Sequence, residues 1–170
     1  MKALEMIKYV HNHEFYILLI IAFNISLDIT HGNDTILINE VELDPSCDNR
    51  YNDCLEWVEL YNYGDKAIDI SGWIVSSSHS FKIPDGNIIR PKGFYCAPKF
   101  HWLSDESAII NLYNITSIID RVGPFNDHIS DSGDSCTWSR CPDGNDSWIF
   151  IIGSKNASNN CVNITSIMSN

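Results

Sequence analysis

The chain has 170 residues and a formal net charge of −11, with 44% hydrophobic and 11% aromatic residues. This apolar fraction is enough to build a core, which excludes a disordered chain, and the length favours one domain with short tails. A surface this acidic repels phosphate backbones, so nucleic acid is not an expected partner.

The N-terminal segment has the pattern of a secretory signal. Lys2 and Lys8 precede the apolar run Phe15–Phe23, which is shorter than the roughly 20 apolar residues of a membrane-spanning helix. We expect residues 1–27 to be a signal peptide. The alternative is an uncleaved signal anchor, through which the chain would attach to a membrane. Both interpretations place the rest of the chain outside the cell or at its surface.

From Thr35 onward the sequence consists of short runs that are typical of β-strands. Thr35–Leu43 and Leu55–Asn62 carry β-branched residues or alternate apolar and polar ones, and both are predicted strands. A bend at Ser71–Gly72 and two Pro-Asp-Gly turns, at Pro84–Gly86 and Pro142–Gly144, separate the strands that follow.

The second half of the chain continues this pattern. The runs "SAIINLYN" and "SIIDRVG" flank Asn114 and fit a hairpin, and "DSCTWSR" and "SWIFII" complete the series. Eight to ten short strands at this spacing predict an all-β antiparallel sandwich or barrel over residues 33–155. Residues 156–170 are polar and are expected to form a C-terminal tail, unless Cys161 ties them to the domain.

The order of these segments resembles the lamin tail domain family, whose fold is an immunoglobulin-like antiparallel β-sandwich. The matching segments are "ILINEVEL", "EWVELYNYGDKAIDISGW", "FKIPDGNIIRPKGFY", "ESAIINLYN" with "SIIDRV", and "CTWSRCPDGNDSWIF", in that order from Ile36 to Phe150. The resemblance implies an exported, single-module member of the prokaryotic type. The chain departs from the family where "GSKNASNN" replaces a T-P-G-x-x-N turn, and it has no heptads from which to build a filament rod.

Six cysteines follow the N-terminal segment, an even number that suits up to three disulfides in an exported chain. We expect Cys47 and Cys54 to pair and close the loop "CDNRYNDC"; the sequence does not pair the other four. N-glycosylation sequons beginning at Asn33, Asn114, Asn145, Asn156 and Asn163 predict a glycosylated surface, and a further one at Asn24 lies within the N-terminal segment.

Carboxylates are the first candidates for chemistry. Glu56 and Glu59 are three residues apart in a predicted strand and point to opposite faces, which is awkward for a glycosidase pair. Glu40 and Glu59 come together if the first two strands pair. We expect them to accept hydrogen bonds from loop amides; the alternative is a hydrolase that uses these clustered carboxylates.

Two loops are candidates for ligand binding. Asp127, Asp131 and Asp134 lie in "FNDHISDSGDSC", where carboxylates and carbonyls suit calcium, although a solvated acidic loop explains them too. Trp102 is the tryptophan expected to be exposed, in position to stack on a sugar, whereas Trp73 and Trp138 are expected in the core.

The sequence lacks the motifs of nucleophilic or phosphate chemistry: it has no G-x-S-x-G, no P-loop and no G-x-G-x-x-G. No catalytic residue and no cofactor other than calcium is expected. We therefore expect a non-catalytic extracellular module that acts in cell-surface adhesion or as an accessory scaffold and binds an extracellular protein or glycan. A carbohydrate-binding module that uses Trp102 is the alternative.

Overall fold

The computed structural model describes residues 35–45, 55–97, 103–104, 107–126 and 136–161. All of them belong to the second of two units into which the chain divides, Thr35–Asn170. The strands are β1 (Ile36–Glu42), β2 (Trp57–Asn62), β3 (Ile68–Asp69), β4 (Ile74–Ser76), β5 (Ser80–Lys82), β6 (Ile88–Ile89), β7 (Phe94–Ala97), β8 (Ala108–Tyr113), β9 (Ile118–Phe125), β10 (Cys136–Arg140) and β11 (Trp148–Ile152).

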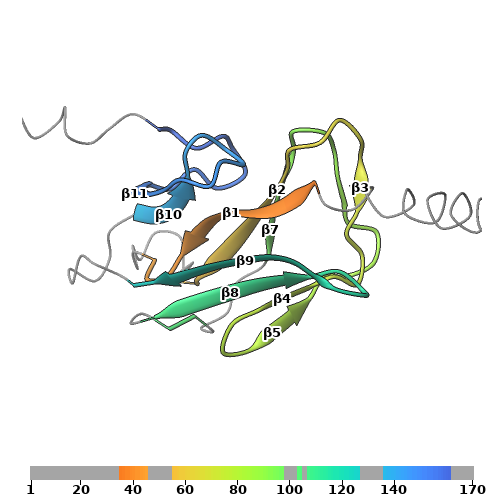
Figure 1. Cartoon of the computed structure of the whole chain (residues 1–170), viewed down its shortest axis with the longest axis horizontal. Coiled ribbons are helices and arrows are strands. Elements are labelled where there is room, and N and C mark those ends of the chain that lie inside the picture. Colours follow the sequence, from red (N-terminus) through yellow and green to blue (C-terminus); the bar gives the residue numbers. More distant parts are fainter. Residues whose placement is uncertain (1–34, 46–54, 98–102, 105–106, 127–135, 162–170) are drawn as a thin grey trace, which may run out of the picture. The chain divides into compact units, whose positions relative to one another are not determined.

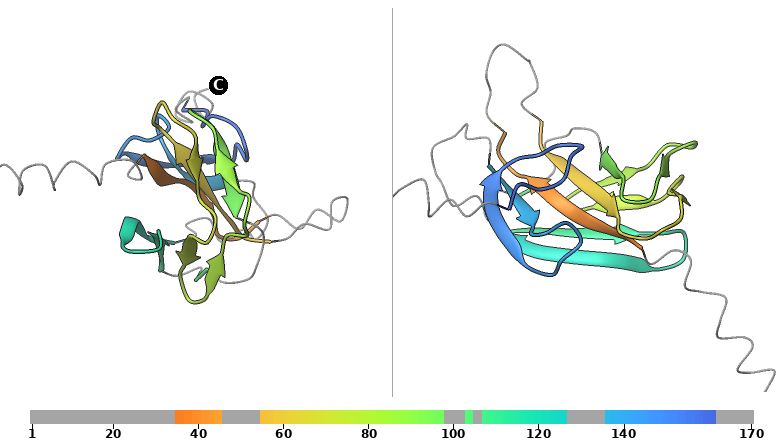
Figure 2. Two further views of the ribbon diagram at one scale, coloured as in Figure 1. Left: turned by 90° about the vertical axis from the view of Figure 1, so that its right-hand side faces the viewer. Right: turned by 90° about the horizontal axis from the view of Figure 1, so that it is seen from above.

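These strands form two main sheets and a small ribbon. The five-stranded sheet has the order β11-β10-β1-β2-β7 and the four-stranded sheet the order β5-β4-β8-β9, while β3 pairs with β6 (Figure 1). Every pairing is antiparallel. Turned views show the two main sheets as separate layers (Figure 2). The predicted all-β, immunoglobulin-like antiparallel sandwich is confirmed, with eleven strands in the described part of the chain rather than eight to ten.

Alternating side chains explain why these runs form strands that bury one face. In β8, Ala108, Ile110 and Leu112 are buried while the residues between them are half-buried. The hairpin expected around Asn114 is confirmed, since β8 and β9 pair and the Asn114 amide donates to the Ser117 carbonyl at 3.0 Å. Trp73 is buried in the core and Trp138 packs against it, as the sequence predicts.

In β1 a bulge shifts the alternation of inward and outward side chains by one residue. Ile38 faces Leu60 and Glu40 faces Glu59, with a register shift between Ile38 and Glu40. The extra residue, Asn39, lets Ile38 and Val41 both reach the core although they are three residues apart. Glu40 therefore points to the outer face of the five-stranded sheet.

The two layers are also joined by a partly buried ion pair. Asp120 on β9 accepts a hydrogen bond from the Ile38 amide at 2.9 Å and lies 3.2 Å from the Arg140 guanidinium. The same guanidinium donates to the Ile38 carbonyl at 2.7 Å. Three strands from two sheets thus meet at one carboxylate, and the buried Arg140 guanidinium is paired with the half-buried Asp120.

Candidate functional site

The outer face of the five-stranded sheet carries a pair of buried carboxylates. Glu40 on β1 and Glu59 on β2 are direct cross-strand partners, and both side chains are completely shielded from solvent. Side chains in this relation lie about 5 Å apart at Cβ, close enough for the two charges to interact. The sequence analysis expected this meeting if the first two strands pair, and they do.

A C-terminal segment covers this pair. Residues 153–161, here called the strap, follow β11 and run back across the sheet (Figure 1). The Ser154 amide donates to Glu40 at 2.8 Å and the Asn156 amide donates to Glu59 at 2.5 Å. Between them, the Lys155 ammonium lies 5.3 Å from the centre of the Trp57 ring. The expectation that both carboxylates hydrogen-bond loop amides is confirmed.

Hydroxyl groups and a thiol complete the surroundings of the pair. Thr137 and Ser139 on β10 donate to Glu40 at 2.6 and 3.2 Å. The Cys96 thiol on β7 donates to Glu59 at 3.6 Å, and Cys96 is a free cysteine. The second oxygen of Glu59, Oε1, is buried and accepts no hydrogen bond from the described residues. Glu40 therefore has several hydrogen-bond donors around its carboxylate, whereas one oxygen of Glu59 has none among the described residues.

The electrostatics follow from that difference. Burial raises the pKa of Glu59 from its ordinary 4.5 to about 7, against the hydrogen bond from the Asn156 amide, and the neighbouring Glu40 charge adds to the increase. Burial also raises the pKa of Glu40, although the hydrogen bonds from Thr137, Ser154 and Ser139 oppose it. Burial raises the pKa of the Cys96 thiol far above its ordinary value, so it stays protonated.

A second network fixes the far end of the strap. The bulge residue Asn39 donates to Asp143 at 3.0 Å and accepts from the Gly144 amide at 3.1 Å. Asp143 also accepts from the Asn159 amide at 3.0 Å, and the buried Asn159 side chain donates to the Arg140 carbonyl at 2.8 Å. The bulge, the 142–144 turn and the strap are thereby bound together.

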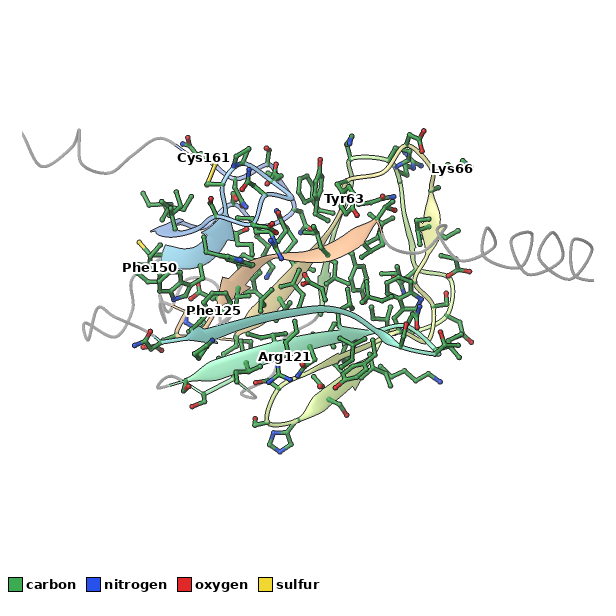
Figure 3. The ribbon with its side chains drawn as sticks, viewed as in Figure 1. Tyr63, Lys66, Arg121, Phe125, Phe150 and Cys161 are labelled. Atoms are coloured by element: carbon green, nitrogen blue, oxygen red, sulfur yellow. A yellow bond between two sulfur atoms is a disulfide. The ribbon has the colours of Figure 1, made fainter. Side chains whose placement is uncertain are left out.

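A disulfide closes this network. Cys141 and Cys161 are linked, with their Cα atoms 5.5 Å apart, a normal separation for a disulfide (Figure 3). Residues 156–161, the first part of the expected polar tail, are held to the domain through Cys161, which is the exception that the sequence had left open. The sequence had not paired either cysteine.

A third buried carboxylate has a similar structural role. Glu56, just before β2, accepts a hydrogen bond from the Leu103 amide at 2.6 Å. Glu40, Glu56 and Glu59 are therefore all acceptors for backbone amides. Glu40 and Glu59 lie beneath the strap, and this arrangement offers them as anchors for chain segments rather than as a pair flanking a scissile bond.

Several sequence-predicted sites fall outside the described residues. These are the acidic-loop residues Asp127, Asp131 and Asp134, the cysteines Cys47 and Cys54, the sequon residues Asn33 and Asn163, the tryptophan Trp102, and the whole segment 1–27. Within the described ranges, no three His, Cys, Asp or Glu side chains gather as metal ligands. Those ranges also contain no helix of the length and apolarity needed to cross a membrane.

Four residues that hold the site together were not among the predicted site residues: Asn39, Asp120, Arg140 and Asn159. Each joins segments more than 15 residues apart, so no local spacing reveals the contact. A signal was available at Arg140, which is the charged residue at the end of the strand run Cys136–Arg140.

The comparisons with known proteins agree with this architecture. The family model described as Lamin Tail Domain matches residues 30–125, more than half of the chain. The chain belongs to the lamin tail domain family. The lamin tail domain is in general a non-catalytic immunoglobulin-like module. No curated protein and no solved structure matches the chain significantly. The matched residues end with β9, and β10, β11 and the strap extend the module beyond them.

Proposed function

We propose that this lamin tail domain protein is an exported, non-catalytic module that binds an extracellular protein and acts in adhesion or as an accessory scaffold at the cell surface. The observation that carries the proposal is the use of Glu40 and Glu59. The two carboxylates most similar to a catalytic pair have no exposed surface and accept the strap amides. Both carboxylates therefore hold the strap to the sheet instead of facing a substrate.

Export is supported by the disulfide and by the predicted signal segment. A Cys141–Cys161 bridge persists in an oxidising compartment and is rare in the reducing cytoplasm. The net charge of −11 suits a surface that stays soluble outside the cell and avoids nucleic acid. Residues 1–27 supply the signal peptide, or an anchor that keeps the module on the membrane surface.

The experiment that tests export uses the full chain with a C-terminal tag, produced without any added leader. We expect the tag in the medium or on intact, non-permeabilised cells. Recovery of the protein only inside the cells, with its thiols reduced, would overturn the proposal.

The class of partner is tested in a cell-binding assay with the purified protein. The cells are treated with protease or with glycan-removing enzymes before the protein is added. Binding to a protein partner is expected to disappear after mild protease treatment of the cells and to survive removal of their glycans. The Trp102→Ala variant is expected to bind as the wild type does. Loss of binding after glycan removal and in Trp102→Ala would favour the carbohydrate-binding alternative instead.

Calcium is proposed as a ligand of the acidic loop that contains Asp127, Asp131 and Asp134. The support is the number of carboxylate and carbonyl oxygens that such a loop supplies. A cation that binds only the folded state stabilises it by about 2.7 kcal/mol at a hundredfold excess over Kd. We expect calcium to raise the unfolding temperature relative to excess chelator, and a triple Asp→Asn variant to lose that response. An unchanged unfolding temperature would mean that the loop does not bind calcium and that its aspartates are simply hydrated.

A further inference from the structure

The turn between β8 and β9 exposes an apolar tip. Ile115 is 84% exposed and Ile118 52%, and Tyr113, directly opposite Ile118 in the hairpin, is half-buried. Single exposed isoleucines are ordinary on protein surfaces, but here two flank one turn with an aromatic ring beside them. This group presents apolar surface to solvent at the tip of the hairpin.

The same turn contains the sequon Asn114-Ile115-Thr116 in an ordered geometry. Asn114 Oδ1 accepts hydrogen bonds from the Thr116 amide at 2.8 Å, the Thr116 hydroxyl at 3.1 Å and the Ser117 amide at 2.7 Å. The oxygen of the side-chain amide is therefore anchored inward. Its nitrogen, Nδ2, makes no hydrogen bond to a described residue and is left available for a covalent attachment.

The other two described sequons lack this arrangement. At Asn145 the Ser147 amide donates to Oδ1 at 3.0 Å, but no bond joins Oδ1 to the Ser147 hydroxyl. At Asn156 the hydroxyl of Ser158 donates to Asp143 instead, and the Asn156 amide is bound to Glu59 in the strap. Asn114 alone among the three combines the hydroxyl contact with an apolar surface beside it.

We propose that Asn114 carries an N-linked glycan that covers the exposed tip formed by Tyr113, Ile115 and Ile118. The inference rests on the proposed export, because glycan transfer takes place in the secretory pathway. The co-reactant is an oligosaccharide linked to a polyprenyl diphosphate. A bond forms between Asn114 Nδ2 and the anomeric carbon of the first sugar, the bond from that carbon to the diphosphate oxygen breaks, and the lipid diphosphate leaves with the electron pair. One N–H proton is released, and nothing is oxidised or reduced.

The attached sugars have apolar faces and hydroxyl edges, so they shelter isoleucine and tyrosine while presenting hydroxyls to water. The anchored Oδ1 restricts the direction in which the first sugar leaves the turn. The glycan therefore lies over the tip, and the hairpin keeps its shape because its own backbone bonds are untouched by the modification.

The test sends the full chain into the secretory pathway of a glycosylating host behind an added leader, so that it does not depend on the native N-terminus. Glycan release in heavy-oxygen water marks each occupied Asn, and the tryptic peptide 100–121 contains Asn114 as its single sequon. We expect Asn114 to be occupied in most molecules and more often than Asn145. Occupancy of Asn114 no higher than in a Thr116→Ala variant would overturn the proposal, whereas failure of export without the added leader would count against the proposed function alone.

The covering role is tested on the folded, glycosylated protein. Enzymatic removal of the glycan is expected to increase retention on a hydrophobic-interaction column, and an Ile115→Ser, Ile118→Thr double variant is expected to abolish that increase. The Asn114→Asp variant is the matched control, since it keeps an oxygen for the Thr116 and Ser117 donors and loses the attachment atom. It is expected to behave as the deglycosylated wild type. Retention that is unchanged by deglycosylation would show that the glycan does not cover the tip.

Discussion

Replacing Glu59 by Gln is expected to stabilise the domain at neutral pH, although it removes a carboxylate that holds the strap. Burial raises the pKa of Glu59 from 4.5 to about 7. The folded state therefore binds the Glu59 proton more tightly than the unfolded state does. The stabilisation from this proton is fully present below about pH 4.5 and is lost as the pH rises to about 7.

The size of the effect follows from the same two values. A difference of one pKa unit corresponds to 1.36 kcal/mol, so the rise from 4.5 to about 7 corresponds to about 3 kcal/mol. Gln has the shape of the protonated side chain and retains an oxygen for the Asn156 amide. Its nitrogen takes the place of Oε1, which accepts no hydrogen bond from the described residues. The variant should therefore match the wild type near pH 4.5 and exceed its free energy of unfolding by up to about 3 kcal/mol near pH 8.

Urea unfolding of both proteins at several pH values between 4.5 and 8, with the disulfide intact, measures this difference. The control is Asp69→Asn, because hydrogen bonds from Ser71 lower the pKa of Asp69 and so give the opposite sign. Its cost should be nearly constant from pH 4.5 to 8, because the contribution of Asp69 is lost only as the pH falls below its ordinary pKa of 3.8. Two results would refute this reasoning. One is that the free energies of unfolding of wild type and Glu59→Gln differ by the same amount at every pH in this range; the other is that the variant becomes less stable than the wild type as the pH rises.

Three further substitutions test the contacts around the strap and the hairpin. Replacing Cys141 and Cys161 together by Ser should lower the free energy of unfolding by about 3 kcal/mol, because the bridge closes a loop with a sequence separation of 20. Denaturant unfolding measures this loss, and an unchanged unfolding midpoint would contradict it. Asn39→Ala should cost about 1–3 kcal/mol in the same assay, since it leaves the Gly144 amide and one Asp143 contact without a partner, whereas a cost below 0.5 kcal/mol would mean that solvent replaces them. Gly123→Ala should destabilise the domain by more than about 1 kcal/mol, because Gly123 has φ 97° and a Cβ atom there would overlap the Ala108 carbonyl; a wild-type unfolding temperature would refute this.

Much of the fold was predictable because its determinants are local. The alternation in Thr35–Leu43 and Leu55–Asn62 indicates strands whose apolar residues gather on one face, and the Pro-Asp-Gly turns mark where strands end. Pairing of these two strands brings Glu40 close to Glu59, but their direct cross-strand pairing also needs the one-residue register shift between Ile38 and Glu40. The role of these carboxylates as acceptors for loop amides was also predictable, since a buried charge needs hydrogen-bond donors.

The rest depended on contacts between segments distant in sequence. The bulge at Asn39 shows no glycine or proline, and only its bonds to Asp143 and Gly144 explain it. The Cys141–Cys161 bridge was one of 15 pairings open to six cysteines. The polar composition after residue 155 predicted a loose tail, yet that same polarity supplies the hydrogen bonds by which the strap lies on the sheet.

The most direct test of the account is the redox state of Cys141 and Cys161 in protein isolated from its native cells. Free thiols are alkylated at lysis, and the non-reduced digest is then searched for linked peptides. We expect a peptide pair joined through Cys141 and Cys161, which would establish both the anchored strap and an oxidising compartment. Recovery of both cysteines as alkylated thiols would contradict the anchored strap and the oxidising compartment.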